Sequence, residues 1–122
     1  MDEADHGRAL AHCRGAALDR AGAQSELFVA DADGAIVGLC TVYLDIESVR
    51  FGQRAWVEDL AVHPDHRSAG HGKALLDAAK DWAREHGATH LELDSAETRA
   101  DAHRFYEREQ PSWRSISFGW EL

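Results

Sequence analysis

One stretch in the middle of the chain constrains the fold most, because three local signals follow one another there in a fixed order. The segment Trp56–Val62 is apolar and β-prone, and Pro64 ends it. Glycines follow at Gly70 and Gly72, and Gly87 stands where a helix would stop. Between them, apolar side chains recur at the three- and four-residue spacing of one helix face: Ala74, Leu75, Ala78, Ala79, Trp82 and Ala83. The sequence predicts a strand, a glycine-containing turn and an amphipathic helix.

The predicted turn has the chemistry of an anion site. A helix N-terminus presents unpaired N–H groups and the positive end of the helix dipole, while glycines let a ligand approach the backbone closely. Arg67 adds a forked cation that suits phosphate oxygens. These features predict a pyrophosphate seat. A dinucleotide fingerprint is excluded because Leu75 occupies the place of its third glycine, and a P-loop is excluded because Ala74 replaces its hydroxyl residue.

Patterns elsewhere predict a mixed sheet flanked by helices. The Asp33–Gly34 pair is a hairpin-turn signal between two β-prone runs, and Gly38 is expected to mark a bulge. Thr98 and Asp101 form a capping-box-like start for a last helix. The predicted elements are a helix over 5–22, strands over 26–30, 35–46, 56–62 and 88–94, helices over 74–86 and 98–109, and a terminal strand over 113–122.

Length and charge limit the classes of protein to which the chain can belong. The 122 residues fit a single domain, 1–122, and contain no apolar run long enough to span a membrane. The acidic start of the chain does not resemble a signal peptide, and Cys13 and Cys40 suggest no disulfide framework, so a cytoplasmic location is expected. A net charge of −9 argues against nucleic acid as a partner. The charge would attract a cationic substrate, or it serves only solubility or adaptation to salt.

The order of motifs resembles the GNAT N-acetyltransferase superfamily over roughly residues 26–106. The resemblance rests on the Arg67-x-x-Gly70-x-Gly72 turn after a strand that ends Val62-His-Pro, and on the final helix containing Phe105-Tyr106. It implies an α/β (α+β) fold: a mixed, mostly antiparallel twisted sheet whose central parallel strand pair splays apart, flanked by helices. It also implies that 1–122 is one N-acetyltransferase domain with a shortened N-terminal part.

By the same resemblance, acetyl-CoA is the cosubstrate and its pyrophosphate binds at the turn. The strand before the turn would offer backbone groups to the pantetheine arm. The residues assigned in this way are Leu60, Ala61, Val62, Arg67, Ser68, Ala69, Gly70, His71, Gly72 and Lys73.

Acetyl transfer to an amine needs a base for the ammonium and a donor for the leaving thiolate. Glu58 and Asp59 are the base candidates, and in a regular strand they would point to opposite faces. Structural pairing with Arg54 or His90 is the alternative for one of them. The Glu-Asp-Leu-x-Val run resembles the spermidine/spermine-type acetyltransferases, and by that match Glu58 is favoured. Tyr106 is the acid candidate by resemblance, and a core tyrosine is its alternative.

The resemblance therefore predicts an N-acetyltransferase that moves an acetyl group from acetyl-CoA to a primary amine through a tetrahedral intermediate. A cationic small molecule is the expected acceptor, and the family often forms homodimers. An acyl-CoA-binding module without transferase activity is the alternative. No metal is expected, since His63, His66 and His71 lack further ligands at zinc spacing and fit solvated turn histidines. Four aromatic side chains fit either an amine-site wall or core and dimer packing: Phe51, Trp56, Trp113 and Trp120.

Overall fold

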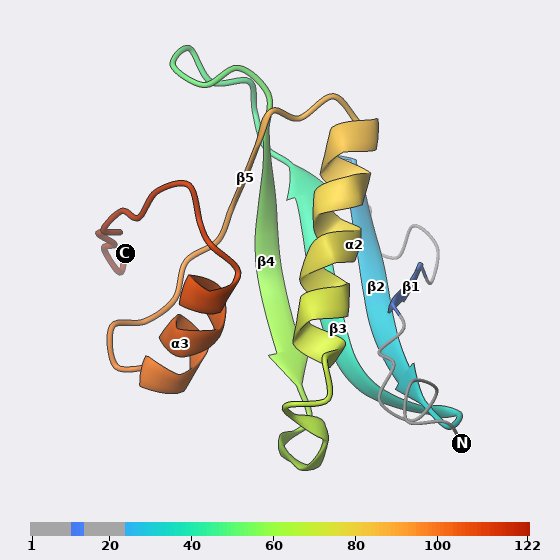
Figure 1. Ribbon diagram of the computed structural model, residues 1–122. Coiled ribbons are helices and arrows are strands. Elements are labelled where there is room, and N and C mark those ends of the chain that lie inside the picture. The colour runs from blue at the N-terminus through green and yellow to red at the C-terminus, as the bar shows by residue number, and fades with distance from the viewer. Residues whose placement is uncertain (1–10, 14–23) are drawn as a thin grey trace.

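The computed structural model describes residues 11–13 and 24–122, which form a five-stranded mixed sheet and two α-helices (Figure 1). The strands lie in chain order, and their bounds are β1 Ala11–Cys13, β2 Ser25–Ala32, β3 Ala35–Leu44, β4 Arg54–Val62 and β5 His90–Glu92. The first four pair antiparallel, whereas β4 and β5 are parallel. The predicted fold class is confirmed.

The β2–β3 hairpin forms at the predicted turn. Asp33 and Gly34 adopt φ of 51° and 88°, and the Gly34 N–H donates to Oδ1 of Asp31 at 2.8 Å. The register shifts nearby, because Ala30 pairs with Gly38 while Asp31 pairs with Ile36. This irregularity next to Gly38 is the predicted bulge. The glycine also permits close packing, since a Cβ there would lie 2.9 Å from the carbonyl oxygen of Ala61.

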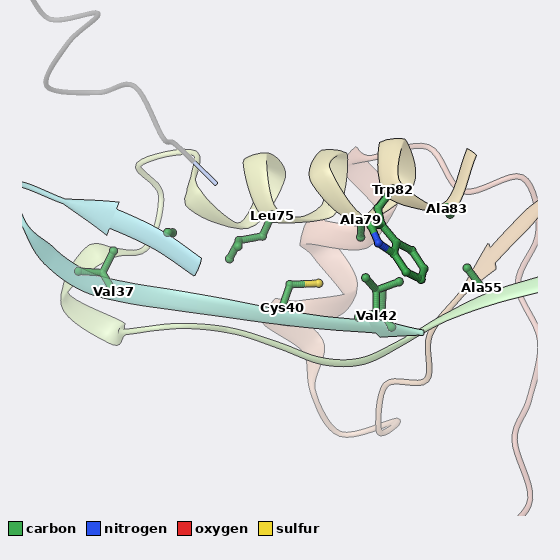
Figure 2. Packing of buried hydrophobic residues seen from close by; sticks show 10 residues of the cluster. Val37, Cys40, Val42, Ala55, Leu75, Ala79, Trp82 and Ala83 are labelled. Atoms are coloured by element: carbon green, nitrogen blue, oxygen red, sulfur yellow. The ribbon is translucent and has the colours of Figure 1, made fainter. Parts of the chain in front are cut away.

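Helix α2 (His71–Glu85) crosses from β4 to β5 and covers one face of the sheet (Figure 1). Leu75, Ala79 and Trp82 point from the helix onto the strands, where they meet apolar side chains of β3 and β4 (Figure 2). Gly87, with φ of 83°, ends the helix, and the Ala88 N–H donates to the carbonyl oxygen of Ala83 at 2.9 Å. The predicted helix and its glycine stop are confirmed.

Helix α3 (Ala100–Arg108) follows β5, lies at the level of the C-terminal end of β4 (Figure 1) and contains no fully buried residue. The helix is where the sequence predicts it, but its start differs. Arg99 is the N-cap residue, and no side chain caps the helix, so the expected capping box at Thr98 is wrong. In the turn before α2, a short 3₁₀ helix, η1, spans Pro64–His66.

The N-terminal prediction is wrong where the structure can test it. Residues 11–13 form β1, whose Ala11 and Cys13 pair with Ala30 and Phe28 of β2, instead of a helix. Backbone pairing with a sheet edge outweighs a weak helical pattern that Gly15 already interrupts. The remainder of the predicted helix over 5–22 lies outside the described residues.

The predicted terminal strand over 113–122 is also wrong, because this segment has no regular secondary structure. Its start rests against the sheet: the Trp113 ring stacks on Phe51 at 6.2 Å, and Ser117 Oγ donates to Asp94 at 3.4 Å. Alternation alone cannot make a strand without backbone pairing. Four side chains of the segment are largely exposed: Ile116, Phe118, Trp120 and Leu122. Within the described residues, no helix is long and apolar enough to cross a membrane.

Candidate functional site

The site begins where the two parallel strands separate. β4 and β5 pair only over Arg54–Trp56 and His90–Glu92, although β4 continues to Val62. Beyond Trp56, the edge of β4 that faces β5 therefore has no strand partner among the described residues. An unpaired strand edge offers N–H and C=O groups to a ligand that runs alongside it. Leu60, Ala61 and Val62 lie in this stretch, with the side chains of Leu60 and Val62 packed against the core.

The turn that follows β4 leaves the start of α2 open to an anion. Gly70 is the N-cap residue with φ of 87°, and no side chain caps the helix. The first helical bond in this turn runs from the Ala74 N–H to the Gly70 carbonyl oxygen at 3.0 Å, which leaves the preceding N–H groups for another acceptor. Ser68 is also left-handed, with φ of 66°. Together with the side chains of Arg67 and Lys73, the turn fits a phosphate group.

The two glycines of the turn have different roles. Gly70 supplies the left-handed backbone at which a side chain would be strained. Gly72 instead makes room for α3, because a Cβ there would lie 3.3 Å from Cζ of Phe105. The expectation that both glycines serve ligand approach is thus refined: one shapes the turn, and the other lets the two helices meet.

Glu58 and Asp59 do not alternate as a regular strand requires. Thr41 pairs with Asp59 but Val42 pairs with Val57, so Glu58 is the extra residue of a β-bulge. Val57 and Leu60 both pack in the core, whereas the two carboxylates are exposed. The expectation that they point to opposite faces is wrong, since the bulge turns both away from α2.

The partners of these carboxylates also differ from the expected ones. Arg54, an expected partner of one of them, instead forms ion pairs with Asp45 at 3.1 Å and Glu92 at 3.6 Å. Asp59 Oδ2 instead accepts from Thr41 Oγ1 at 2.9 Å, and the Asp59 N–H donates to the same hydroxyl oxygen at 3.0 Å. The Thr41 contact was not foreseen, because cross-strand register is not visible in the sequence.

Tyr106 is half-buried on α3, where its ring meets that of Phe105 at 5.3 Å. Burial raises the pKa of the Tyr106 hydroxyl above its usual value, and the Arg99 charge opposes that shift. Tyr106 therefore stays protonated at neutral pH and can donate a hydrogen bond.

The Cys40 thiol is fully buried, and desolvation together with the Asp59 charge raises its pKa to about 12.

The histidines of the turn form a ring cluster without the geometry of a metal site. The His63 and His66 rings lie 5.8 Å apart, and those of His66 and His71 lie 6.4 Å apart. Among the residues that the structure describes, no group of three or more metal-ligating side chains is found. His71 is not a solvated turn residue as expected: only 6% of it is exposed, and its Nδ1 has no hydrogen-bond partner.

The aromatic residues considered for the wall of an amine site do not all lie together in the structure. Phe51, His90 and Trp113 form one cluster at the start of β5, and the Arg50 guanidinium lies 4.9 Å from the Phe51 ring. Trp120 is 82% exposed in the C-terminal segment and so lines no cleft with them. The cluster anchors the segment after α3 to the sheet.

An open groove of about 500 Å³ runs beside β5, between α2, α3 and the C-terminal segment. Tyr106 and His103 lie on its wall, but the turn from Arg67 to Lys73 does not. We place the phosphate chemistry at the turn and not in the groove, because unpaired helix N–H groups are found at the turn.

Comparison with known proteins identifies the family. Residues 3–110 match the acetyltransferase (GNAT) family model, and the chain belongs to this family. It is 44% identical over 80 residues to the uncharacterized N-acetyltransferase YhdJ of Bacillus subtilis, a match that covers 66% of this chain and 56% of the relative. It is 40% identical over 87 residues to streptothricin acetyltransferase of Streptomyces lavendulae, covering 70% and 44%.

Solved structures agree with the fold. An aminoglycoside acetyltransferase from an uncultured soil metagenomic sample, in complex with sisomicin, superposes with a TM-score of 0.71 and 25% identity, covering 80% of this chain and 66% of that chain. The chain spans about half the length of the two curated relatives described above.

Proposed function

We propose that this protein is an acyl-CoA-dependent N-acetyltransferase that transfers an acetyl group from acetyl-CoA to a primary amine of a cationic small molecule. One observation carries the proposal: an uncapped helix N-terminus after the Arg67-x-x-Gly70-x-Gly72 turn lies directly beyond β4, whose edge toward β5 has no strand partner among the described residues from Val57 onward. The turn suits a diphosphate, and the strand edge suits an amide-bearing arm.

The coenzyme contacts follow from this arrangement. When bound, acetyl-CoA supplies an activated acetyl thioester. The backbone N–H groups of the turn, from Arg67 through Ser68, Ala69, Gly70, His71 and Gly72 to Lys73, would hold the diphosphate. The β5-facing edge at Leu60, Ala61 and Val62 would hold the pantetheine amides.

The two carboxylates have separate roles in the proposal. Asp59 is tied to Thr41 and so has a fixed position, which suits binding of the ammonium group of the acceptor. Glu58 makes no hydrogen bond or ion pair with the described residues and is exposed on the same face, which suits acceptance of a proton from the ammonium. A neutral amine results and can attack the thioester carbonyl.

Tyr106 would donate its hydroxyl proton to the sulfur of the departing thiolate, and the proton that the acetylated nitrogen then loses would restore the tyrosine hydroxyl. Its raised pKa keeps the hydroxyl protonated through the neutral range, as a general acid requires. Its half-buried position beside the groove limits competing hydrogen bonds to water.

Charge and relatives support a cationic acceptor. The chain carries a net charge of −9, and both bulge carboxylates face the same side of the sheet. One solved relative is an aminoglycoside acetyltransferase. Aminoglycosides are sugars with several amino groups, which are cationic near neutral pH.

Two measurements test the proposal: calorimetric binding of acetyl-CoA, and release of coenzyme A in the presence of polyamines, aminoglycosides, amino acids and peptides. Amine-dependent release supports the enzyme, whereas binding without release from any amine supports the alternative of a coenzyme-binding module. Absence of acetyl-CoA binding removes both. Glu58→Gln should lower kcat by about tenfold to a hundredfold and leave the Kd of acetyl-CoA unchanged. Glu97→Gln, in the exposed loop before α3, is the matched control.

A homodimer and a cytoplasmic location belong to the same proposal. The exposed apolar side chains Phe118, Trp120 and Leu122 would favour self-association, and the free, buried Cys40 fits a reducing compartment. Analytical ultracentrifugation tests the dimer, and cell fractionation tests the location. A monomer at all concentrations would remove the first statement without affecting the activity.

A further inference from the structure

The phosphate-binding turn carries two cations, and each is already engaged by a carboxylate of α3. Arg67 Nη1 lies 3.6 Å from Asp101 Oδ2, and Lys73 Nζ lies 3.5 Å from Glu109 Oε1. Asp101 stands in the first turn of α3 and Glu109 is its C-cap residue. The helix thus lies across the turn with one acid at each end.

The carboxylates of this cluster oppose an anionic ligand. Lys73 also binds Asp77 of its own helix at 3.1 Å, and the Arg99 charge acts on Asp101 together with that of Arg67, so three carboxylates stand among three cations. The Arg67 and Asp101 side chains are 55% and 60% exposed, so this pair is solvated and contributes little to folding stability, whereas the Glu109 side chain of the other pair is only 15% exposed. A diphosphate that enters the turn must attract the same two cations and is repelled by the same carboxylates.

The surroundings favour the charged form of one member of each pair. The pKa of Asp101 is lowered, chiefly by the backbone N–H of Ala102 and further by the Arg67 charge. The pKa of Lys73 is raised, chiefly by its hydrogen bond to Asp77 and further by Glu109. Asp101 and Lys73 are therefore charged at neutral pH.

We infer that Asp101 and Glu109 are built-in competitors of the coenzyme diphosphate, which must take Arg67 and Lys73 from α3 when it binds. The inference rests on the proposed function and deepens it. Since α3 also carries Tyr106 and rests on Gly72 through Phe105, coenzyme binding exchanges two of the contacts that hold this helix against the turn. The two acids are positioning residues that set the affinity for the coenzyme and favour its release.

Calorimetry with coenzyme A as the probe tests this inference on the whole chain. Asp101→Asn and Glu109→Gln should each lower the Kd by about twofold to fivefold at low salt, and the double variant should lower it by about tenfold. The gain should shrink toward 0.5 M NaCl, because exposed charges are screened. A purely structural role for either acid predicts the opposite sign, since a disturbed α3 would weaken binding.

Glu107→Gln is the matched control, because it removes the same charge from α3 at a residue that binds Arg114 instead of the turn. Its Kd should equal that of the wild type, and thermal unfolding checks that all variants are folded. The inference is overturned if Asp101→Asn and Glu109→Gln leave the Kd unchanged or raise it while the wild type binds coenzyme A normally. A wild type that does not bind coenzyme A overturns the proposed function itself, and this inference with it.

Discussion

The sheet has a closed half and an open half, and they differ in almost every physical respect. In the closed half, β2, β3 and β4 pair along nearly their whole lengths, and four of the six buried residues of α2 join the core cluster with these strands. In the open half, β5 pairs with β4 over three residues, and α3 buries none. Packing in the first half supplies stability, whereas incomplete pairing in the second leaves backbone and polar groups available. Substitutions should therefore separate cleanly into those that unfold the chain and those that disable the site.

The largest expected effect lies in the closed half. Leu75 is fully buried between α2 and the sheet (Figure 2), so Leu75→Ala should lower the free energy of unfolding by about 3–4 kcal/mol. Ile116→Ala, at a site that is 74% exposed, should change it by less than about 0.5 kcal/mol. Urea unfolding measures both, and equal effects would contradict the division into two halves.

Tyr106→Phe should show the reverse behaviour in the open half. Loss of the hydroxyl should reduce kcat by about a hundredfold, equivalent to about 2.7 kcal/mol of the barrier, and leave urea unfolding unchanged. Steady-state kinetics with saturating acetyl-CoA measures the effect. A variant with full activity would show that Tyr106 is a packing residue, in keeping with its contact to Phe105.

Cys40 gives the closed half a sensitivity to alkali. Its pKa is raised by burial from 9.0 to about 12, so the folded state holds the thiol proton more tightly than the unfolded state does. This contribution to stability is complete below pH 9 and is lost as the pH rises toward 12. Between pH 8 and pH 10.5 the wild type should lose about 2 kcal/mol that Cys40→Ala does not lose. Urea unfolding at both pH values tests this, and parallel losses in the two proteins would contradict it.

The smallest expected effect lies at the border between the halves. Gly72→Ala adds a Cβ 3.3 Å from the Phe105 ring, which must shift and move α3 with it. The Kd for acetyl-CoA should rise by about threefold to fivefold, or about 1 kcal/mol. Stability should not fall, because alanine favours a helix by about 1 kcal/mol over glycine. Calorimetry and thermal unfolding of the same sample measure the two changes. A loss of affinity together with a loss of stability would mean that Gly72 supports the core.

Local sequence signals suffice to predict the elements whose first and last residues are marked by proline or glycine. Pro64, Gly70 and Gly87 punctuate the strand–turn–helix unit, and the structure follows them. The same holds for the hairpin at Asp33–Gly34. Such residues act through their own backbone angles, so no distant partner is needed to interpret them.

Other features depend on distant partners and could not be predicted. Residues 11–13 pair with β2 against their helical pattern, and the segment after Pro111 stays irregular despite its alternation. Arg54 forms ion pairs with Asp45 and Glu92 because the strand register brings their carboxylates within reach. The candidate site residues come from resemblance, and the faces and partners of their side chains depend on the three-dimensional register.

The extra residue at Glu58 has a consequence for how this strand can vary. Core side chains stand at Ala55 and Val57 before the bulge and at Leu60 and Val62 after it, so the bulge lets one extra residue enter the strand without moving the core positions on either side. Val57, Asp59 and Leu60 already face the successive residues Val42, Thr41 and Cys40. Deleting Glu58 would therefore leave an even ladder in which every core side chain keeps its face. A homologue that shortens the strand here by one residue needs no compensating change in its polar and apolar sequence.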